Sequence, residues 1–290
     1  MDRLIYYNDG IVDATDARVA PNLAGLLYGW GIFTTLKIYD GIPFAFERHW
    51  ERLVKHAEKA RITVPVESEQ ARRAFTELVS ANAIHQGRAR ITLLKGDAGT
   101  WRIEPGRQSE FLIFTSPDPA RSRREEAITV SPYRILSSGP LAGVKRTAML
   151  ENLLALEEAR ARGFTEAVML NERGEIVSAT SANIFWVEGD QLITPSLATG
   201  CVAGIMRQLL LEIADQLRLY VTEGSFPVQR LRDASEVFLT STLREIAPVG
   251  SYDINQYSPA ERRITRMLGR EFQKTVRNAK MSRKSEVRRQ

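Results

Sequence analysis

A lysine in a segment of small residues is the first candidate for chemistry in this chain. Lys145 follows Leu141-Ala-Gly-Val144 and stands just before a helix that the sequence predicts over 149–162. A lysine drawn inward there could act as a nucleophile or a base, because burial lowers the pKa of an ammonium group. A single lysine is usually a surface residue, so Lys145 gains weight only together with other features.

Two further segments have the composition of an anion site. Gly200-Cys-Val-Ala-Gly204 runs directly into a helix predicted over 205–219, whose first N–H groups would point at the loop. Thr240-Ser-Thr242 ends an apolar strand with three hydroxyls. Taken singly, the first segment is most often a plain loop and the second is ordinary turn chemistry. Together they favour a phosphate cup.

The elements that must position these residues alternate between extended and helical. In the first half the sequence predicts an amphipathic helix over 47–60 and strands over 3–7, 33–39, 43–46, 89–95 and 111–115. Asp40-Gly41 predicts a turn, and the residues from Gly96 to Gln108 a loop. After a short strand from Ile128 to Val130, the second half predicts the helices 149–162 and 205–219 and strands over 166–170, 184–187, 192–194 and 236–240.

Composition limits the class of protein. The 290 residues are 43% hydrophobic and 26% charged, which excludes a disordered chain and a disulfide-stapled mini-protein. The single cysteine, Cys201, excludes an intramolecular disulfide and a zinc site built on several cysteines. No apolar run is long enough for a membrane helix, and the first residues do not form a signal peptide, so a cytoplasmic location is expected.

The net charge of +5 is unevenly distributed. Residues 262–290 carry eleven Lys and Arg against two Glu, which leaves residues 1–261 mildly acidic. A charge run at a terminus is usually a solvated, frayed helix. The three histidines predict no metal site, and His49 and His56 are interpreted as a surface pair on one helix. The expected organisation is α/β (α+β) in two domains, with an N-terminal α/β domain over 1–117, a connection over 118–140, a second domain over 141–269 and a basic tail over 270–290.

The three candidate segments belong to a set of six ordered blocks, which resembles the class IV, or fold-type IV, pyridoxal-phosphate (PLP) enzymes over about residues 3–252. This family includes branched-chain and D-amino-acid aminotransferases and 4-amino-4-deoxychorismate lyase. The resemblance implies a smaller N-terminal α/β domain, a larger C-terminal pseudo-barrel domain that binds PLP, and usually a homodimer. The blocks are Phe33-Thr-Thr-Leu-Lys-Ile38, His49-Trp-Glu-Arg-Leu53, Lys145 with Glu151-Asn-Leu-Leu-Ala155, Ser181-Ala-Asn-Ile-Phe-Trp186, Gly204-Ile-Met-Arg-Gln208, and Thr240-Ser-Thr242 with Pro248-Val249.

The resemblance also implies a role for individual residues. Lys145 resembles the lysine that forms the Schiff base with PLP and then moves protons. Arg52 resembles the arginine that grips the PLP phosphate, a task that suits a planar guanidinium. Ile205 and Met206 would offer backbone N–H groups to that phosphate, and Ser241 and Thr242 would complete the cup.

Two positions depart from the family pattern. The family usually has a glutamate five residues before Asn183, where it keeps the pyridine nitrogen protonated, but this chain has Ser178. A neutral hydroxyl cannot hold that proton, so the cofactor ring should be a weaker electron sink. The second departure is Ala148, where an asparagine often follows the lysine by three. PLP binding is still expected, although both departures argue against full aminotransferase efficiency.

Finer similarities favour the lyase over an aminotransferase. Phe33-Thr34-Thr35 and Gly204-Ile-Met-Arg-Gln208 are more similar to aminodeoxychorismate lyases, in which the threonine matching Thr35 assists proton transfer. The expected reaction converts 4-amino-4-deoxychorismate to p-aminobenzoate and pyruvate. The alternative is an aminotransferase for branched-chain or D-amino acids.

Both reactions involve substrate carboxylates, which arginines would bind. Arg88, Arg90 and Arg102 are the candidates, with Lys37 and Lys95 as alternatives that by default are surface lysines. A nucleic-acid-binding tail on a non-catalytic PLP fold is a minor alternative, because the tail lacks interleaved aromatic residues apart from Phe272.

Overall fold

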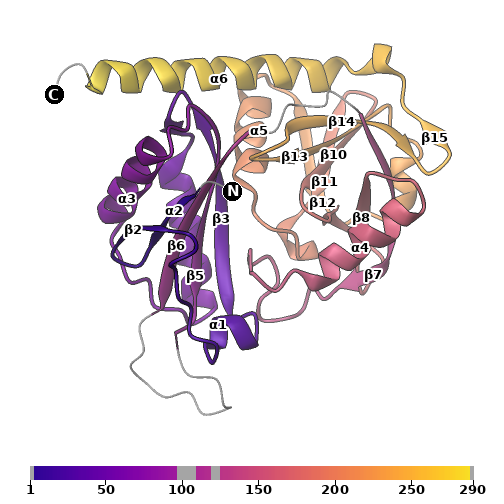
Figure 1. Ribbon diagram of the computed structural model, residues 1–290. Coiled ribbons are helices and arrows are strands. Elements are labelled where there is room, and N and C mark those ends of the chain that lie inside the picture. Colours follow the sequence, from indigo (N-terminus) through magenta and orange to yellow (C-terminus); the bar gives the residue numbers. More distant parts are fainter. Residues whose placement is uncertain (1–2, 97–108, 119–124, 288–290) are drawn as a thin grey trace. The chain divides into compact units, whose positions relative to one another are not determined.

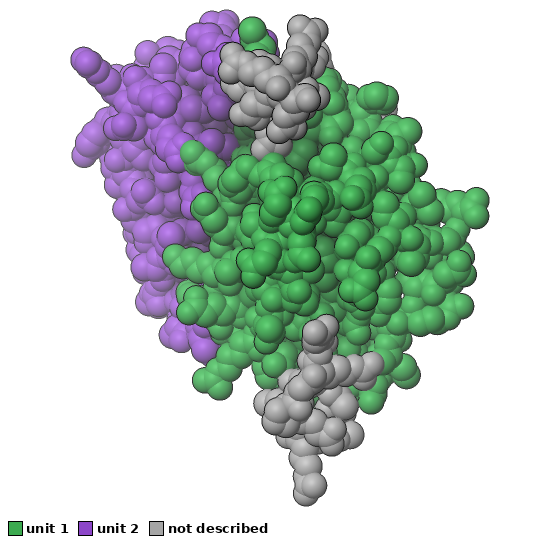
Figure 2. Space-filling view, turned by 90° about the vertical axis from the view of Figure 1, so that its left-hand side faces the viewer, with its two compact units in different colours: residues 1–121, 144–148, 279–290 green, residues 122–143, 149–278 purple. Residues whose placement is uncertain are grey.

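The computed structural model describes residues 3–96, 109–118 and 125–287, and it describes side chains as far as 281. The chain forms two compact units, which are coloured green and purple in Figure 2. Unit 1 comprises Met1–Arg121, Val144–Ala148 and Ala279–Gln290, and unit 2 comprises Ser122–Gly143 and Met149–Asn278. The domain ranges expected from the sequence stay a prediction. The loop predicted from Gly96 to Gln108 lies, apart from Gly96, outside the described residues.

Unit 1 contains an antiparallel sheet of six strands in the order β2-β1-β6-β5-β3-β4. Its centre is formed by β3 and β5, which pair over nine residues with Thr35 opposite Arg90. The predicted Asp40-Gly41 turn joins β3 to β4, and both residues have the left-handed backbone that a two-residue hairpin requires. The strands are β1 (Leu4–Tyr7), β2 (Gly10–Asp13), β3 (Gly31–Tyr39), β4 (Ile42–Pro43), β5 (Gln86–Leu94) and β6 (Glu110–Pro117).

Three helices accompany this sheet: α1 (Ala24–Leu27), α2 (Phe46–Lys59) and α3 (Ser68–Ala81). The longer two pack on the sheet, with α2 against β3 and α3 against β1 and β6 (Figure 1). The prediction of a strand over 43–46 is wrong at its end. Ala45 has a left-handed backbone, and Phe46 starts α2 with a fully buried ring. The sequence reading did not predict α3.

Unit 2 contains a sheet in the order β12-β11-β10-β13-β14-β7-β8-β9, with β15 paired to β14. The last strand, β9, also lies against β10 and β11, so the sheet curls back on itself. The strand predicted at Ile128–Val130 is longer, because β7 runs between β14 and β8 in the middle of this sheet. The strands are β7 (Glu126–Ile135), β8 (Glu166–Asn171), β9 (Ile176–Ala179), β10 (Asn183–Glu188), β11 (Gln191–Pro195), β12 (Tyr220–Gly224), β13 (Glu236–Ser241), β14 (Glu245–Tyr252) and β15 (Asn255–Gln256).

The helices α4 (Leu150–Ala161) and α5 (Ile205–Gln216) and the short 3-10 turns η1 (Leu197–Thr199), η2 (Val228–Leu231) and η3 (Pro259–Glu261) belong to unit 2. The last helix, α6 (Arg263–Val287), belongs to unit 2 as far as Asn278. The expectation of a frayed tail is wrong at least to Val276. Leu268, Phe272 and Val276 recur every four residues and are all buried, so one face of α6 is packed. Among the described helices, none is both long and apolar enough to cross a membrane.

Candidate active site

The main chain around Lys145 pairs with β3 of the unit 1 sheet through an isolated bridge. Ile32 and Arg146 form an antiparallel bridge, in which the Phe33 N–H donates to the Lys145 carbonyl over 3.1 Å. The Thr147 N–H donates to the Gly31 carbonyl over 2.8 Å. The lysine is therefore held in register with β3, the first of the predicted blocks.

Two cations lie over the ring of Phe33, on β3. The guanidinium carbon of Arg90 is 3.6 Å from the ring centroid, and Lys145 Nζ is 4.3 Å from it. Thr35 is two residues farther along β3, on the same face as Phe33, and is the cross-strand partner of Arg90. The structure thus brings Lys145, Arg90 and Thr35 together around one aromatic ring.

The surroundings of Lys145 change its acid–base behaviour. Burial, followed by the charges of Arg52 and Arg90, lowers its pKa to about 7. Both neighbours with a charge effect are cations, so each disfavours the ammonium form. A substantial fraction of Lys145 is therefore a neutral amine at pH 7, which is the form that attacks carbonyl carbons and accepts protons.

Arg52, on α2, is held by the first threonine of the β3 block, Thr34. Its Nη2 donates to Thr34 Oγ1 over 2.9 Å, and the same oxygen lies 2.7 Å from His49 Nδ1. Burial lowers the pKa of Arg52 to about 10. The interpretation of His49 and His56 as a surface pair is wrong, because both imidazoles are buried under the sheet.

The other predicted cations of unit 1 have structural contacts. Arg88 is exposed, and its Nε donates to Ser116 Oγ over 2.8 Å. The expectation of a surface residue is wrong for Lys37, which is buried and paired with Asp118. Lys95 donates to the Arg61 carbonyl over 3.1 Å, beside the Trp30 ring. Arg102 lies outside the described residues.

In unit 2, the loop that enters α5 is joined to β10 through one side chain. Asn183 Nδ2 donates to the Val202 carbonyl over 2.9 Å. A Cβ on Gly204 would lie 2.1 Å from Asn183 Oδ1, so only glycine fits there. Gly204 caps α5 without a side chain, and the buried Ile205 and Met206 are the first residues of that helix. Sequence reading quoted Asn183 within a block but gave it no role.

The same asparagine leads to the hydroxyls at the end of β13, because Asn183 is the cross-strand partner of Thr240. Ser241 ends that strand and Thr242 follows in the turn, and both are half-buried. Ser241 Oγ accepts the N–H of Arg244 over 3.1 Å. Unit 2 therefore places both the start of α5 and the end of β13 next to Asn183, the first residue of β10.

An ion pair between Arg244 and a buried carboxylate supports this turn. Glu166 is fully buried on β8 and lies 2.8 Å from the Arg244 guanidinium. Glu166 also accepts the Ser181 hydroxyl over 3.1 Å. The pair joins the turn after β13 to the segment before β10, and sequence reading missed it, since the two residues are 78 positions apart.

The two departures from the family pattern have different surroundings. Ser178 is half-buried on β9, opposite Met169 on β8, two residues before the segment that Glu166 holds. Ala148 belongs to unit 1, where a Cβ on Gly29 would lie 3.0 Å from the Ala148 Cβ. The backbones of these two residues come close because both side chains are small.

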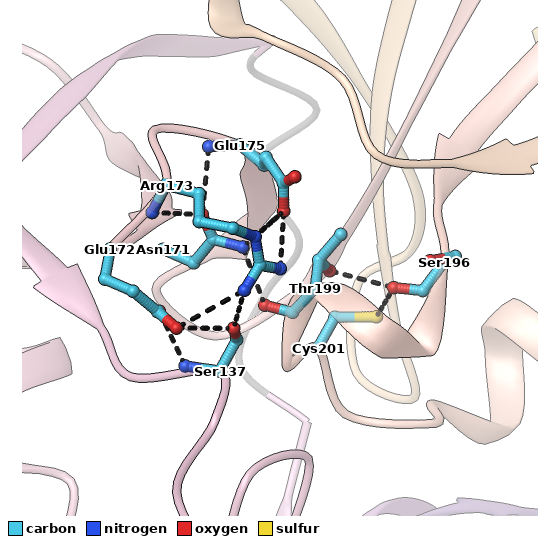
Figure 3. A network of polar contacts seen from close by, with 8 residues as sticks. All are labelled: Ser137, Asn171, Glu172, Arg173, Glu175, Ser196, Thr199 and Cys201. Atoms are coloured by element: carbon cyan, nitrogen blue, oxygen red, sulfur yellow. Dashed lines mark hydrogen bonds and ion pairs between the residues drawn. The ribbon is translucent and has the colours of Figure 1, made fainter.

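A second polar network holds the loop that leads into α5 (Figure 3). The carboxylate of Glu172 accepts the N–H and the hydroxyl of Ser137, each over 2.8 Å, and these bonds lower its pKa to about 2. Asn171 Nδ2 reaches the Thr199 carbonyl at 3.4 Å. Cys201 is buried in the same loop and its thiol pKa is raised by burial, so the thiol is protonated at neutral pH.

These features define a class of protein: an enzyme with a low-pKa lysine among arginines in one unit and a glycine-capped helix start beside hydroxyls in the other. The comparisons with known proteins extend this conclusion. Residues 31–252 match the family model described as amino-transferase class IV. The chain belongs to the class IV aminotransferase family, as the sequence blocks predicted.

Individual relatives differ in their reactions. A putative branched-chain-amino-acid aminotransferase of Methanocaldococcus jannaschii is 31% identical over 92% of this chain and 94% of its own length. The aminodeoxychorismate lyase of Bacillus subtilis is 25% identical over 95% of each chain. A solved branched-chain amino acid aminotransferase from Escherichia coli shares the fold with a TM-score of 0.87 at 25% identity, covering 94% of this chain and 93% of its own.

The family is PLP-dependent, and the residues present suit that cofactor. PLP carries a phosphate dianion and an aldehyde. In unit 1, burial disfavours the charges of Lys145 and Arg52, and a bound anion would relieve that cost. In unit 2, α5 begins after Gly204 with no side-chain cap, so its first N–H groups, together with the adjacent hydroxyls, are of the kind that binds phosphate. The predicted cofactor is therefore compatible with both sets of residues.

Proposed function

We propose that this enzyme is a lyase that converts 4-amino-4-deoxychorismate to p-aminobenzoate and pyruvate. The observation that carries the proposal is Ser178, a neutral side chain on β9 at the position where the family usually has a carboxylate. The carboxylate beside this segment, Glu166, is already engaged by Arg244 and Ser181. The electron demand on the cofactor ring must therefore be modest.

Elimination of the enolpyruvyl group meets that condition. The proton leaves the substrate ring, the carbon–oxygen bond to enolpyruvyl breaks, and the ring becomes aromatic, so negative charge does not accumulate on the cofactor. An aminotransferase needs a longer-lived carbanion and benefits more from a protonated pyridine. The B. subtilis relative named aminodeoxychorismate lyase supports the same choice.

We assign the proton transfers to the residues around Phe33. When bound, PLP supplies the aldehyde that condenses with amines and the ring that accepts electrons. Lys145 Nζ, which is half neutral at about pH 7, would take the substrate proton and return it to the departing enolpyruvate. Thr35 would assist on the same face of β3, and Arg90, opposite it, would bind a substrate carboxylate.

We also propose which residues bind PLP. Arg52 and Lys145 in unit 1 and Ile205, Met206, Ser241 and Thr242 in unit 2 carry the binding groups. Reduction of the PLP-loaded protein with borohydride, followed by peptide mass mapping, should find a pyridoxyl group on Lys145. A label on another lysine would contradict this assignment.

The reaction can be tested without any amino acceptor. Incubation with 4-amino-4-deoxychorismate alone should release p-aminobenzoate, measured by fluorescence after chromatography, and an equal amount of pyruvate. The Lys145→Met variant serves as the control for release without the enzyme. Robust amino transfer from branched-chain or D-amino acids, with no p-aminobenzoate, would contradict the lyase.

That outcome defines the second candidate, a class IV aminotransferase, which the 31% identical M. jannaschii relative favours. The Ser178→Glu variant separates the two, because a carboxylate there should strengthen the electron sink and raise amino transfer. Ser178→Gln is the matched control, since it adds similar volume without charge. Equal amino-transfer rates in Ser178→Glu and Ser178→Gln would remove the electronic argument.

We further propose a cytoplasmic homodimer, and α4 offers a surface for the second copy. Its Leu150, Leu153 and Leu154 lie on one helix face and are exposed, whereas Ala155 and Ala159 are buried. An exposed apolar stripe of this kind favours association. Leu153→Lys should produce a monomer in light scattering, whereas Ile254→Lys, at another exposed apolar residue of unit 2, should not. A monomeric wild type would contradict the dimer.

The alternative of a nucleic-acid-binding tail would use Phe272, the aromatic residue of the tail, to stack on bases. Phe272 in the basic tail is only 1% exposed, so its ring is not presented for stacking on bases. We therefore assign the tail no role in binding nucleic acid.

A further inference from the structure

His56, in the last turn of α2, accepts a hydrogen bond from the main chain of Lys145. The Lys145 N–H donates to His56 Nδ1 over 3.1 Å. His56 follows Arg52 by four residues, so both lie on the same face of α2. His56 is buried, with 7% of its surface exposed. A residue of the helix that carries Arg52 thus also contacts Lys145.

The geometry of the bridge to β3 explains why this contact matters. In the bridge between Ile32 and Arg146, the carbonyl of Lys145 accepts from Phe33 on β3. In a regular antiparallel pair the Lys145 N–H would return a bond to the Phe33 carbonyl, but here it donates to His56 Nδ1. His56 supplies the acceptor, so the peptide groups on both sides of the Lys145 Cα are fixed.

The chemistry of the imidazole fits an acceptor role. Nδ1 can accept only in the neutral ring with the proton on Nε2. Burial, and then the charges of Arg52, Lys59, Lys145 and Lys55, lower the pKa of His56 to about 4. The ring is therefore neutral at pH 7, and it adds no positive charge beside Lys145.

We propose that His56 is a positioning residue for Lys145: its Nδ1 fixes the main-chain rotation that places Nζ over the Phe33 ring. The inference rests on the proposed role of Lys145 in binding PLP, and it is independent of the choice between lyase and aminotransferase. Without this acceptor the Lys145 peptide can rotate, and Nζ can move away from Phe33 and the two arginines.

Three substitutions of His56 distinguish loss of the hydrogen-bond acceptor from loss of the packed side chain. His56→Asn carries an oxygen at the position of Nδ1, His56→Gln carries it one bond farther out, and His56→Leu has none. His85→Leu is the matched control, because His85 is an exposed histidine of the same unit. Circular dichroism and thermal unfolding establish which variants are folded.

Two measurements report on Lys145 directly. In the PLP-free protein, the pH dependence of Lys145 acetylation by acetic anhydride, followed by peptide mass spectrometry, gives its pKa. In the PLP-loaded protein, the pH titration of the cofactor absorbance gives a second value. His56→Leu and His56→Gln should raise the pKa of Lys145 by about one unit, which makes acetylation at pH 7 about fivefold slower because the neutral fraction of the amine falls.

His56→Asn is the decisive test of the proposal. His56→Asn should restore the wild-type titration, and His85→Leu should leave it unchanged. Wild-type titration in His56→Gln or His56→Leu would overturn the proposal, and so would a folded His56→Asn that titrates like His56→Leu. If borohydride labels a different lysine in the wild type, the role of Lys145 fails, but the acetylation comparison still tests the contact with His56.

Discussion

Lys145 in unit 1 is a half-buried cation and Arg262 in unit 2 is a buried one, and their neighbours differ. The charged groups that shift the pKa of Lys145 are the cations Arg52 and Arg90. Arg262 makes two hydrogen bonds to the Glu125 carboxylate, of 2.5 and 2.9 Å, and two longer ones to backbone carbonyls. The first arrangement lowers the pKa of a cation, and the second stabilises the charge.

The same contrast extends to the carboxylates of unit 2. Glu166 faces Arg244, and Arg173 lies 2.7 Å from Glu175. Opposite charges that satisfy each other hold loops in place but leave little reactivity. We infer that the reactive amine belongs to unit 1, whereas unit 2 uses its charged pairs to shape backbone groups for an anion. Substitutions in each unit can test this division.

The largest effect is expected from removing the reactive amine. Lys145→Met should lower turnover by about 10²–10⁴-fold, because a positioned base of matched pKa contributes that much. It should also abolish the pyridoxyl label. Arg262→Met, the counterpart in unit 2, should keep its turnover but lose about 1 kcal/mol of stability to chemical denaturation, since it removes hydrogen bonds to an exposed carboxylate and to two backbone carbonyls. Comparable losses of turnover in both variants would contradict the division.

A smaller effect is expected at the proposed phosphate arginine. Arg52→Met should weaken PLP binding by about 10–100-fold, since hydrogen bonds to a charged group contribute about 1.5–3 kcal/mol. Arg52→Lys should lose less, because it keeps the charge without the planar fork. Equilibrium dialysis against PLP measures both. Unchanged affinity in Arg52→Met would show that the phosphate is held elsewhere.

A third prediction tests the shape of the cup in unit 2. Gly204→Ala places a Cβ against Asn183 Oδ1 and should weaken PLP binding by about tenfold, at a cost typical of a local clash. Asn183→Ala removes the bond to Val202, and the double variant should bind PLP better than the sum of the two losses predicts. Additive losses would show that the two residues do not act through this contact.

Much of the fold could be predicted from the sequence, because its central elements have strong apolar patterns. β3, β5, α2, α4 and α5 were all predicted to within a few residues. Two of the strands that were missed have weaker signals: β12 has no buried residue, and β14 contains both Pro248 and Gly250. Local composition could not reveal that these segments complete a curled sheet.

The candidate site, like the fold, could be predicted only in part from the sequence. Lys145, Gly204 and Ser241 were proposed from the sequence because small residues and hydroxyls stand next to predicted elements. The contact of Phe33 with two cations depends on the register of β3 and β5, and the contact of His56 with Lys145 joins residues 89 positions apart. Such contacts are set by tertiary packing, which no local pattern encodes.

The pH dependence of stability should also distinguish Lys145 in unit 1 from Arg262 in unit 2. Lys145 has a folded pKa of about 7 against an ordinary value of 10.5, so between these values the unfolded chain binds a proton that the native state does not. The stability of the PLP-free protein should therefore rise from pH 7 to 10.5, with a slope of at most ~1.4 kcal/mol per pH unit. Chemical denaturation should show a flatter curve in Lys145→Met. If Lys145→Met shows the same rise in stability as the wild type, the rise does not come from Lys145. Arg262→Met should still show the rise.

The smallest effect is expected from Glu172, in the network that holds the loop leading into α5. Its pKa of about 2 lies below the ordinary 4.5, so its contribution to stability is complete above pH 4.5 and is lost as the pH falls toward 2. Glu172→Gln keeps an acceptor for Ser137 but removes the charge, so acid unfolding followed by circular dichroism should depend less on pH in that window. Turnover and PLP affinity at neutral pH should not change, because the carboxylate bonds to Ser137 and Arg173 and not to the cup itself. A loss of PLP affinity in Glu172→Gln would show that the paired charges of unit 2 act on the cofactor as well as on the loop.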